Sequence, residues 1–246
     1  RPHHQGAHER RMVGGDSVDI ECDWGLNGLR AHASGRVVVI VDVLSFSTST
    51  TVAVARGAEI IPCEWNEDRA AELAAIYAAE IAAKRGKGRF TLAPASLRDI
   101  APGTRLVLPS QNGSTLAAAA QRLEAAAVVT GCIRNAAAVA KWIGRRPAVV
   151  IAAGERWPDD SVRFAIEDWL GAGAILSRID GKRSAAAEAA VAAFEKLPIR
   201  ETLTQAPSGL ELIEAGYADD IEIASQLDSD TAVPLLLGNA FKLAPL

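Results

Sequence analysis

The chain has 246 residues, of which 49% are hydrophobic and 23% are charged, so it can bury one sizeable core. Its formal net charge of −4 argues against a strongly basic nucleic-acid-binding surface, and no apolar run is long enough to cross a bilayer. The three cysteines (Cys22, Cys63 and Cys132) are odd in number and lack CxxC spacing, which argues against a disulfide framework or a structural zinc site. We therefore expect a cytoplasmic protein.

The N-terminal segment differs from the rest of the chain. It is polar and lacks the apolar centre of a signal peptide, and the single methionine is Met12. We interpret residues 1–15 as a disordered extension or a tag. Residues 16–246 are expected to form one domain, because no linker rich in Pro, Ser or Gly divides them.

Apolar runs alternate with alanine-rich stretches along the remaining chain. The predicted strands are 36–43, 58–63, 89–94, 104–109, 126–131 and 147–154. The predicted helices are 52–58, 66–86, 116–126, 136–144, 164–179, 184–197 and 208–227. Continuous Val and Ile runs are typical of strands covered on both faces. The pattern therefore predicts an α/β fold with three α/β/α layers and a largely parallel or mixed central sheet.

Polar residues follow the predicted strands, where ligands bind in open α/β sheets. The first strand ends at Asp42 and is followed by five hydroxyl residues: Ser47, Thr48, Ser49, Thr50 and Thr51. Hydroxyls beside unpaired backbone N–H groups at a helix start favour an anion, phosphate above all. Helix capping is the alternative, but capping accounts for one hydroxyl and leaves four without a role.

Two further loops offer anion contacts. Asn112, Gly113 and Ser114 follow the strand at 104–109, where glycine permits a close backbone approach to a ligand. An ordinary turn into a helix has the same residues. Arg134 and Asn135 follow the strand at 126–131, and a guanidinium can grip phosphate or sulfonate oxygens in a forked contact. The alternative for Arg134 is a solvated surface arginine.

Four carboxylates are candidate ligands for Mg²⁺, which prefers oxygen: Asp42, Glu155, Glu167 and Asp168. Neighbouring residues of a helix point about 100° apart, so only one of Glu167 and Asp168 is expected to face an ion. An acidic pair on a solvated helix face is the alternative.

Several phosphate chemistries are excluded by inspection. No GxxxxGK[ST] loop is present, which excludes a P-loop nucleotide hydrolase. Ala138 stands where a cysteine phosphatase would need arginine after Cys132, and Leu44 stands where a second aspartate would follow Asp42. All four histidines precede the first confident strand, which argues against a histidine metal site or a Ser-His-Asp triad.

Five segments in order resemble the 2-phosphosulfolactate phosphatase family: VVIVDVLSFSTSTTVAVARGAEIIPC, LVLPSQNGSTLAAAA, VVTGCIRNAAAVA, VVIAAGERW with FAIEDWLGAGAIL, and GLELIEAGYADDIEIASQLDSDTAVPLLLGNAF. The resemblance covers residues 36–241. It implies a magnesium-dependent hydrolase that removes phosphate from 2-phospho-3-sulfolactate, a step toward coenzyme M. The family commonly carries arginine where this chain has Ser45, and its glycine-rich loop is represented by residues 87–97.

The matching positions suggest a mechanism of metal-assisted phosphoryl transfer to water. Asp42 and one of Glu167 and Asp168 would hold Mg²⁺. Glu167 would also orient the attacking water, and Arg134 would hold phosphate or a second anionic group. The remaining positions would bind phosphate: Ser47, Thr48, Ser49, Thr50, Thr51, Asn112, Gly113, Ser114 and Asn135.

Two alternatives stay open. One is a hydrolase of the same fold for a different small phosphorylated or sulfonated acid, and the other is a catalytically silent anion-binding protein. We expect a small acid as substrate and neither nucleic acid nor membrane as partner, and we leave a homodimer open.

Overall fold

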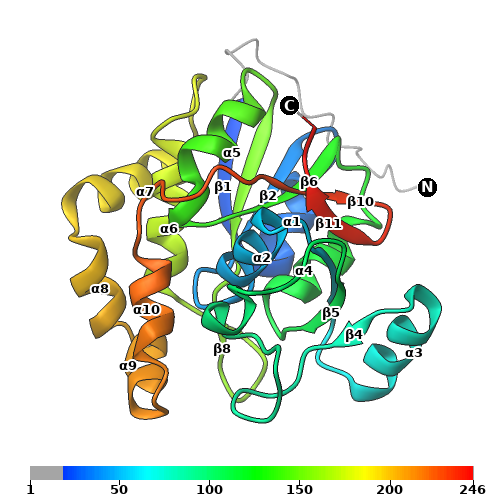
Figure 1. Ribbon diagram of the computed structural model, residues 1–246. Helices are drawn as coiled ribbons and strands as arrows, with labels where there is room; N and C mark the ends of the chain where they lie inside the picture. The colour runs from blue at the N-terminus through cyan, green and yellow to red at the C-terminus, as the bar shows by residue number, and fades with distance from the viewer. Residues whose placement is uncertain (1–18, 246) are drawn as a thin grey trace, which may run out of the picture.

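A mixed nine-stranded sheet with helices on both faces forms the molecule, as the computed structural model of residues 19–245 shows (Figure 1). The predicted α/β class with three layers is confirmed. The expectation for residues 1–15 lies outside the described residues. No helix within residues 19–245 is long and apolar enough to span a membrane.

The sheet consists of two parallel blocks joined by an antiparallel hairpin. The first block is β1 (Ile20–Trp24), β7 (Ala148–Ala152), β2 (Val37–Val41) and β6 (Ala127–Gly131), in that order. The second is β3 (Glu59–Cys63), β5 (Arg105–Pro109) and β4 (Glu80–Ile81). The hairpin of β10 (Pro234–Leu237) and β11 (Ala240–Leu243) lies between β6 and β3 and pairs antiparallel with both. A separate small ribbon contains β8 (Glu155–Arg156) and β9 (Val162–Arg163).

Strand β2 shows why the sheet is covered on both faces, since all five of its residues are buried. Val37, Val39 and Val41 pack in one core with helices α5 (Ala136–Ile143), α6 (Ile166–Leu176) and α7 (Ala185–Lys196). Val38 and Ile40 pack in the other core, with α1 (Gly25–His32), α2 (Phe46–Ala55) and α4 (Gly113–Ala120). Successive side chains of a strand point to opposite faces, so one apolar run supplies both layers.

The remaining helices lie at the periphery. Helix α3 (Glu67–Tyr77) covers β3 and β5, while α8 (Ile199–Gln205), α9 (Pro207–Glu214) and α10 (Ala218–Ala224) lie beside one another (Figure 1). Two 3₁₀ turns, η1 (Pro94–Leu97) and η2 (Ile133–Asn135), complete the set.

Five of the six predicted strands are confirmed as β2, β3, β5, β6 and β7. Helix α2 begins at Phe46 rather than Val52, and three further elements differ from prediction. The helix predicted at 66–86 ends at Tyr77, because Ala78 adopts a left-handed conformation with φ of 48°. The helix predicted at 208–227 is two helices, α9 and α10, separated near Gly216 with φ of 86°.

The third difference is that residues 89–94 form a loop rather than a strand. Thr91 makes one isolated bridge to Ala83, and the Ser96 hydroxyl bonds the Thr91 amide at 3.0 Å and the Ala93 carbonyl at 2.8 Å. Such local side-chain bonds replace the ladder of a strand.

Four pieces of structure were not anticipated: β1 with α1, the β8–β9 ribbon, helix α8 and the β10–β11 hairpin. The hairpin turn is Gly238-Asn239, with φ of 62° at Gly238. Two-residue turns with glycine and asparagine are typical of hairpins, so the sequence did contain this signal.

Candidate functional site

A cavity of about 900 Å³ opens where the segments after β2, β3, β5 and β7 meet. Asp42 and Glu155 line the cavity. Glu167 is buried and does not line it, but its charge acts on both, and we call the three residues the acidic side. Lys84, Arg85 and Lys87 line what we call the basic side. The cavity thus combines a group of carboxyls with a group of cations.

Asp42 is held in place by two backbone amides. Its Oδ1 accepts a hydrogen bond from the amide of Phe46 at 3.3 Å, and its Oδ2 accepts one from the amide of Gly113 at 2.9 Å. A Cβ at Gly113 would lie 2.3 Å from Cδ1 of Phe46, so only glycine allows this approach. The carboxyl group therefore joins the starts of α2 and α4 and is preorganised.

Asp168 has a different environment from Asp42. It is buried, does not line the cavity, and uses both oxygens on backbone amides: Oδ1 accepts from Val43 at 2.7 Å and Oδ2 from Gly154 at 2.8 Å. These bonds connect the loops after β2 and β7. Asp168 therefore holds these two loops together, and each of its oxygens already accepts a backbone amide.

Glu167 and Glu155 retain oxygens that the protein does not saturate. Glu167, in the first turn of α6, is 1% exposed, and its Oε2 has no hydrogen-bond partner among the described residues. Glu155 lines the cavity and accepts a hydrogen bond from Nδ2 of Asn112 at 2.9 Å through Oε2. An unpaired buried oxygen is costly, which suggests that a ligand completes this site.

Burial and mutual repulsion raise the pKa values of the carboxyls. Burial is the main cause at Asp42, whose pKa rises to about 6, with the charge of Glu167 contributing. Burial and the charge of Asp42 raise the pKa of Glu155 to about 7. Burial also raises the pKa of Glu167, and burial with the charges of Asp42 and Glu167 raises that of Asp168 well above its usual range. A cation among these groups would relieve the repulsion.

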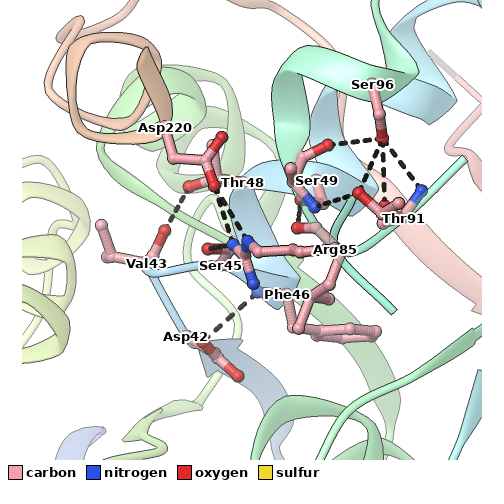
Figure 2. Close-up of polar contacts among 12 residues, drawn as sticks. Asp42, Val43, Ser45, Phe46, Thr48, Ser49, Arg85, Thr91, Ser96 and Asp220 are labelled. Carbon is pink, nitrogen blue, oxygen red and sulfur yellow. Dashed lines mark hydrogen bonds and ion pairs between the residues drawn. The ribbon is translucent and has the colours of Figure 1, made fainter. Parts of the chain in front are cut away.

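Arg85 makes the most polar contacts of the three cations on the basic side. Its Nη2 donates to the hydroxyl of Ser45 at 2.7 Å and to Oδ2 of Asp220 at 2.8 Å (Figure 2). Asp220 lies on α10 and is 1% exposed. The ion pair therefore joins the segment after β4 to a helix that is 135 residues away in the chain.

The predicted hydroxyl cradle is corrected by the structure. Helix α2 begins at Phe46, so Ser47, Thr48, Ser49, Thr50 and Thr51 lie within the helix, and each is 0% exposed. None lines the cavity. Four of the hydroxyls donate to carbonyls, namely Ser47 to Ile40, Thr48 to Val43, Ser49 to Leu92 and Thr51 to Ser47. These side chains replace water inside the core rather than face a ligand.

The other predicted anion contacts separate into two groups. Asn112 lines the cavity, and the Gly113 amide bonds Asp42, so this loop belongs to the site. Ser114 is buried and donates to the Leu108 carbonyl at 2.8 Å.

Arg134 and Asn135 do not line the cavity. The Arg134 guanidinium donates to the Ile223 carbonyl at 3.0 Å, and Nδ2 of Asn135 donates to the Ala232 carbonyl at 2.9 Å. Arg134 thus binds α10, and Asn135 binds the segment between α10 and β10, so the structure does not bring either side chain to this cavity.

Sequence reasoning missed Arg85 and its partner Asp220. A signal was present, since four cations lie within residues 84–89 of a chain whose net charge is −4. The predicted helix at 66–86 included Lys84 and Arg85, so this group of cations was not considered as a binding site.

Comparison with known proteins identifies the family of this chain. A family model described as 2-phosphosulpholactate phosphatase matches residues 27–239. The chain belongs to this family. It is 30% identical over 214 residues to a probable 2-phosphosulfolactate phosphatase of Carboxydothermus hydrogenoformans, covering 82% of this chain and 87% of the relative.

Two more members of the 2-phosphosulfolactate phosphatase family are similar over most of their length. The 2-phosphosulfolactate phosphatase of Methanothermobacter thermautotrophicus is 30% identical over 84% of this chain and 88% of its own. A probable 2-phosphosulfolactate phosphatase of Thermotoga petrophila is 27% identical over 85% of this chain and 92% of its own. The sequence-based resemblance is confirmed, and the expectation of an enzyme of the phosphatase class agrees with these names.

Proposed function

We propose that this protein is a magnesium-dependent phosphoric monoester hydrolase that converts 2-phospho-3-sulfolactate and water to 3-sulfolactate and phosphate. The observation that carries the proposal is the cavity in which Asp42 and Glu155 face Arg85. The relatives' names support this substrate, which would make the reaction a step toward coenzyme M.

The acidic side fits a divalent cation in its chemistry. Its donors are hard oxygens, Glu167 has an unpaired buried Oε2, and the pKa values of Asp42 and Glu155 are raised. Within residues 19–245, no three His, Cys, Asp or Glu side chains are grouped closely enough to hold an ion by themselves. Magnesium usually keeps several waters and takes one or two carboxylates, so Asp42 and Glu167 would suffice. When bound, Mg²⁺ would neutralise charge on the phosphoryl oxygens.

Glu155 is suited to act on the attacking water. It faces the cavity, whereas Glu167 does not, and its pKa of about 7 lies near neutral pH. A carboxylate with such a pKa accepts a proton efficiently as the water oxygen bonds to phosphorus. The ester P–O bond breaks in the same step, and the substrate oxygen leaves and takes up a proton from solvent water. Asn112, which donates to Glu155, would orient the carboxylate.

The test is phosphate release by the full chain after removal of metal with EDTA. We expect release from 2-phospho-3-sulfolactate only when Mg²⁺ is added back, and slower release from phosphorylated hydroxy acids without a sulfonate. Faster turnover of another phosphorylated acid would reassign the substrate. If no substrate releases phosphate while 3-sulfolactate or phosphate raises Tm, the protein binds anions without catalysis, and the proposal fails.

A further inference from the structure

We propose that Arg85 recognises a second anionic group of the substrate, so that the enzyme selects phosphorylated acids bearing a sulfonate or carboxylate beside the phosphoryl group. This inference rests on the proposed function, because it assumes that the acidic side holds the phosphoryl group. Arg85 lines the same cavity as Asp42 and Glu155, and its side chain is 21% exposed. One small substrate could therefore contact both sides.

The guanidinium of Arg85 is oriented by fixed partners. Nη2 donates to Ser45 and Asp220, Nε also donates to Oδ2 of Asp220 at 3.3 Å, and the guanidinium lies 5.5 Å from the ring centre of Tyr217. Figure 2 shows the guanidinium between Ser45 and Asp220. Asp220 is almost fully buried and cannot move away without leaving a charge unpaired. Asp220 is thus a positioning residue for Arg85.

The guanidinium retains donors for a ligand. Within the part of the chain that the structure describes, Nη1 makes no hydrogen bond. The planar fork of arginine matches the oxygens of a carboxylate or sulfonate, and such contacts are stronger than neutral hydrogen bonds.

The charge around Arg85 also favours an anion. Asp220 balances the charge of Arg85, and Lys84 pairs with Glu67 at 3.3 Å. Lys87 lines the cavity and makes no ion pair with any described residue, so its charge is available to an anion. Arg85 also lies close to the acidic side, because it bonds Ser45, and the next residue, Phe46, donates its backbone amide to Asp42 at 3.3 Å. The two sides are therefore close enough to act on one molecule.

The alternative is that Arg85 only tethers its loop to α10. A tether would affect all substrates equally, whereas a recognition residue affects only those with the second anion. Simple aryl phosphates carry a phosphoryl group and no other charge, so they separate the two roles.

The experiment compares Arg85→Met and Arg85→Lys with wild type on 2-phospho-3-sulfolactate, 2-phospholactate and p-nitrophenyl phosphate. We expect Arg85→Met to lower kcat/KM for the sulfonated substrate about 10- to 100-fold, mostly by raising KM. The same change should lower kcat/KM for p-nitrophenyl phosphate by less than about threefold. Arg85→Lys keeps the charge but loses the fork, and should fall between. Arg89→Met is the matched control, because Arg89 lies in the same loop without lining the cavity.

The pattern of losses identifies the group that Arg85 contacts. A loss confined to 2-phospho-3-sulfolactate indicates the sulfonate, and a loss shared with 2-phospholactate indicates the carboxylate. Equal loss on all three substrates would overturn the proposal.

Binding of 3-sulfolactate, measured by calorimetry on the folded wild-type and variant chains, separates this proposal from the phosphatase function. We expect Arg85→Met to weaken that binding at least about tenfold, even if the wild type releases no phosphate. Unchanged binding would overturn the role of Arg85 while leaving the phosphatase proposal intact. If Arg85→Met does not fold, the lysine variant provides the same comparison.

Discussion

Helix α2 and Asp42 of the acidic side both follow strand β2. The polar groups of α2 and those of the acidic side nevertheless have different surroundings. The hydroxyls of Ser47, Thr48 and Thr51 are fully buried and donate to nearby carbonyls. The acidic side is also largely buried, but Oε2 of Glu167 has no partner among the described residues and Glu155 faces the cavity. Buried groups with satisfied hydrogen bonds stabilise a fold, whereas buried groups with spare capacity gain from a ligand.

The largest effect should come from the unpaired carboxyl of the acidic side. Glu167→Gln removes the charge at nearly constant shape, and we expect turnover at limiting Mg²⁺ to fall about 100- to 1,000-fold. Rates measured across a Mg²⁺ titration should show a raised metal requirement. Glu195→Gln, on the exposed face of α7, is the matched control. An unchanged Mg²⁺ dependence would remove Glu167 from the metal site.

The acidic side should also make the metal-free protein less stable at high pH. The folded-state pKa values of Asp42 and Glu155, about 6 and about 7, exceed the ordinary values of 3.8 and 4.5. The folded state therefore binds more protons than the unfolded state in this interval. This contribution is fully present below about pH 4 and is lost as pH rises through 6 and 7.

The corresponding measurement is the free energy of unfolding of EDTA-treated protein at several pH values. We expect it to fall by roughly 2–4 kcal/mol between pH 5 and 8, and Mg²⁺ to reduce the fall. Glu155→Gln should flatten the curve, because it removes one of the titrating groups. A stability that stays level or rises over this interval would contradict the raised pKa values.

The smallest effects should come from α2 and should concern stability. Ser47→Ala leaves the amide of Asp42 without its side-chain acceptor, so the free energy of unfolding should fall by about 1–3 kcal/mol.

Thr50→Val removes a buried hydroxyl that has no partner among the described residues, so it should be neutral or stabilising by up to about 1 kcal/mol. Denaturant unfolding measures both. If Thr50→Val abolished phosphate release while the protein stayed folded, the hydroxyls of α2 would have to be part of the phosphate-binding site after all.

The sequence by itself determined the layers, the family and part of the acidic side. The run Val37–Val41 is apolar at every position and rich in β-branched residues, which favours a strand covered on both faces. Asp42 follows such a strand directly, which placed it at the ligand-binding edge. These features depend on local pattern, and local pattern is visible in one chain.

Only the tertiary structure decided which polar groups remain available. Four of the five hydroxyls at the start of α2 are used in contacts such as that of Ser49 with Leu92, and Arg85 meets Asp220 across 135 residues. The β10–β11 hairpin enters the sheet between strands that precede it by more than 100 residues. Hydrogen-bonding capacity is a property of residue type, but whether it is satisfied depends on partners that only folding brings together.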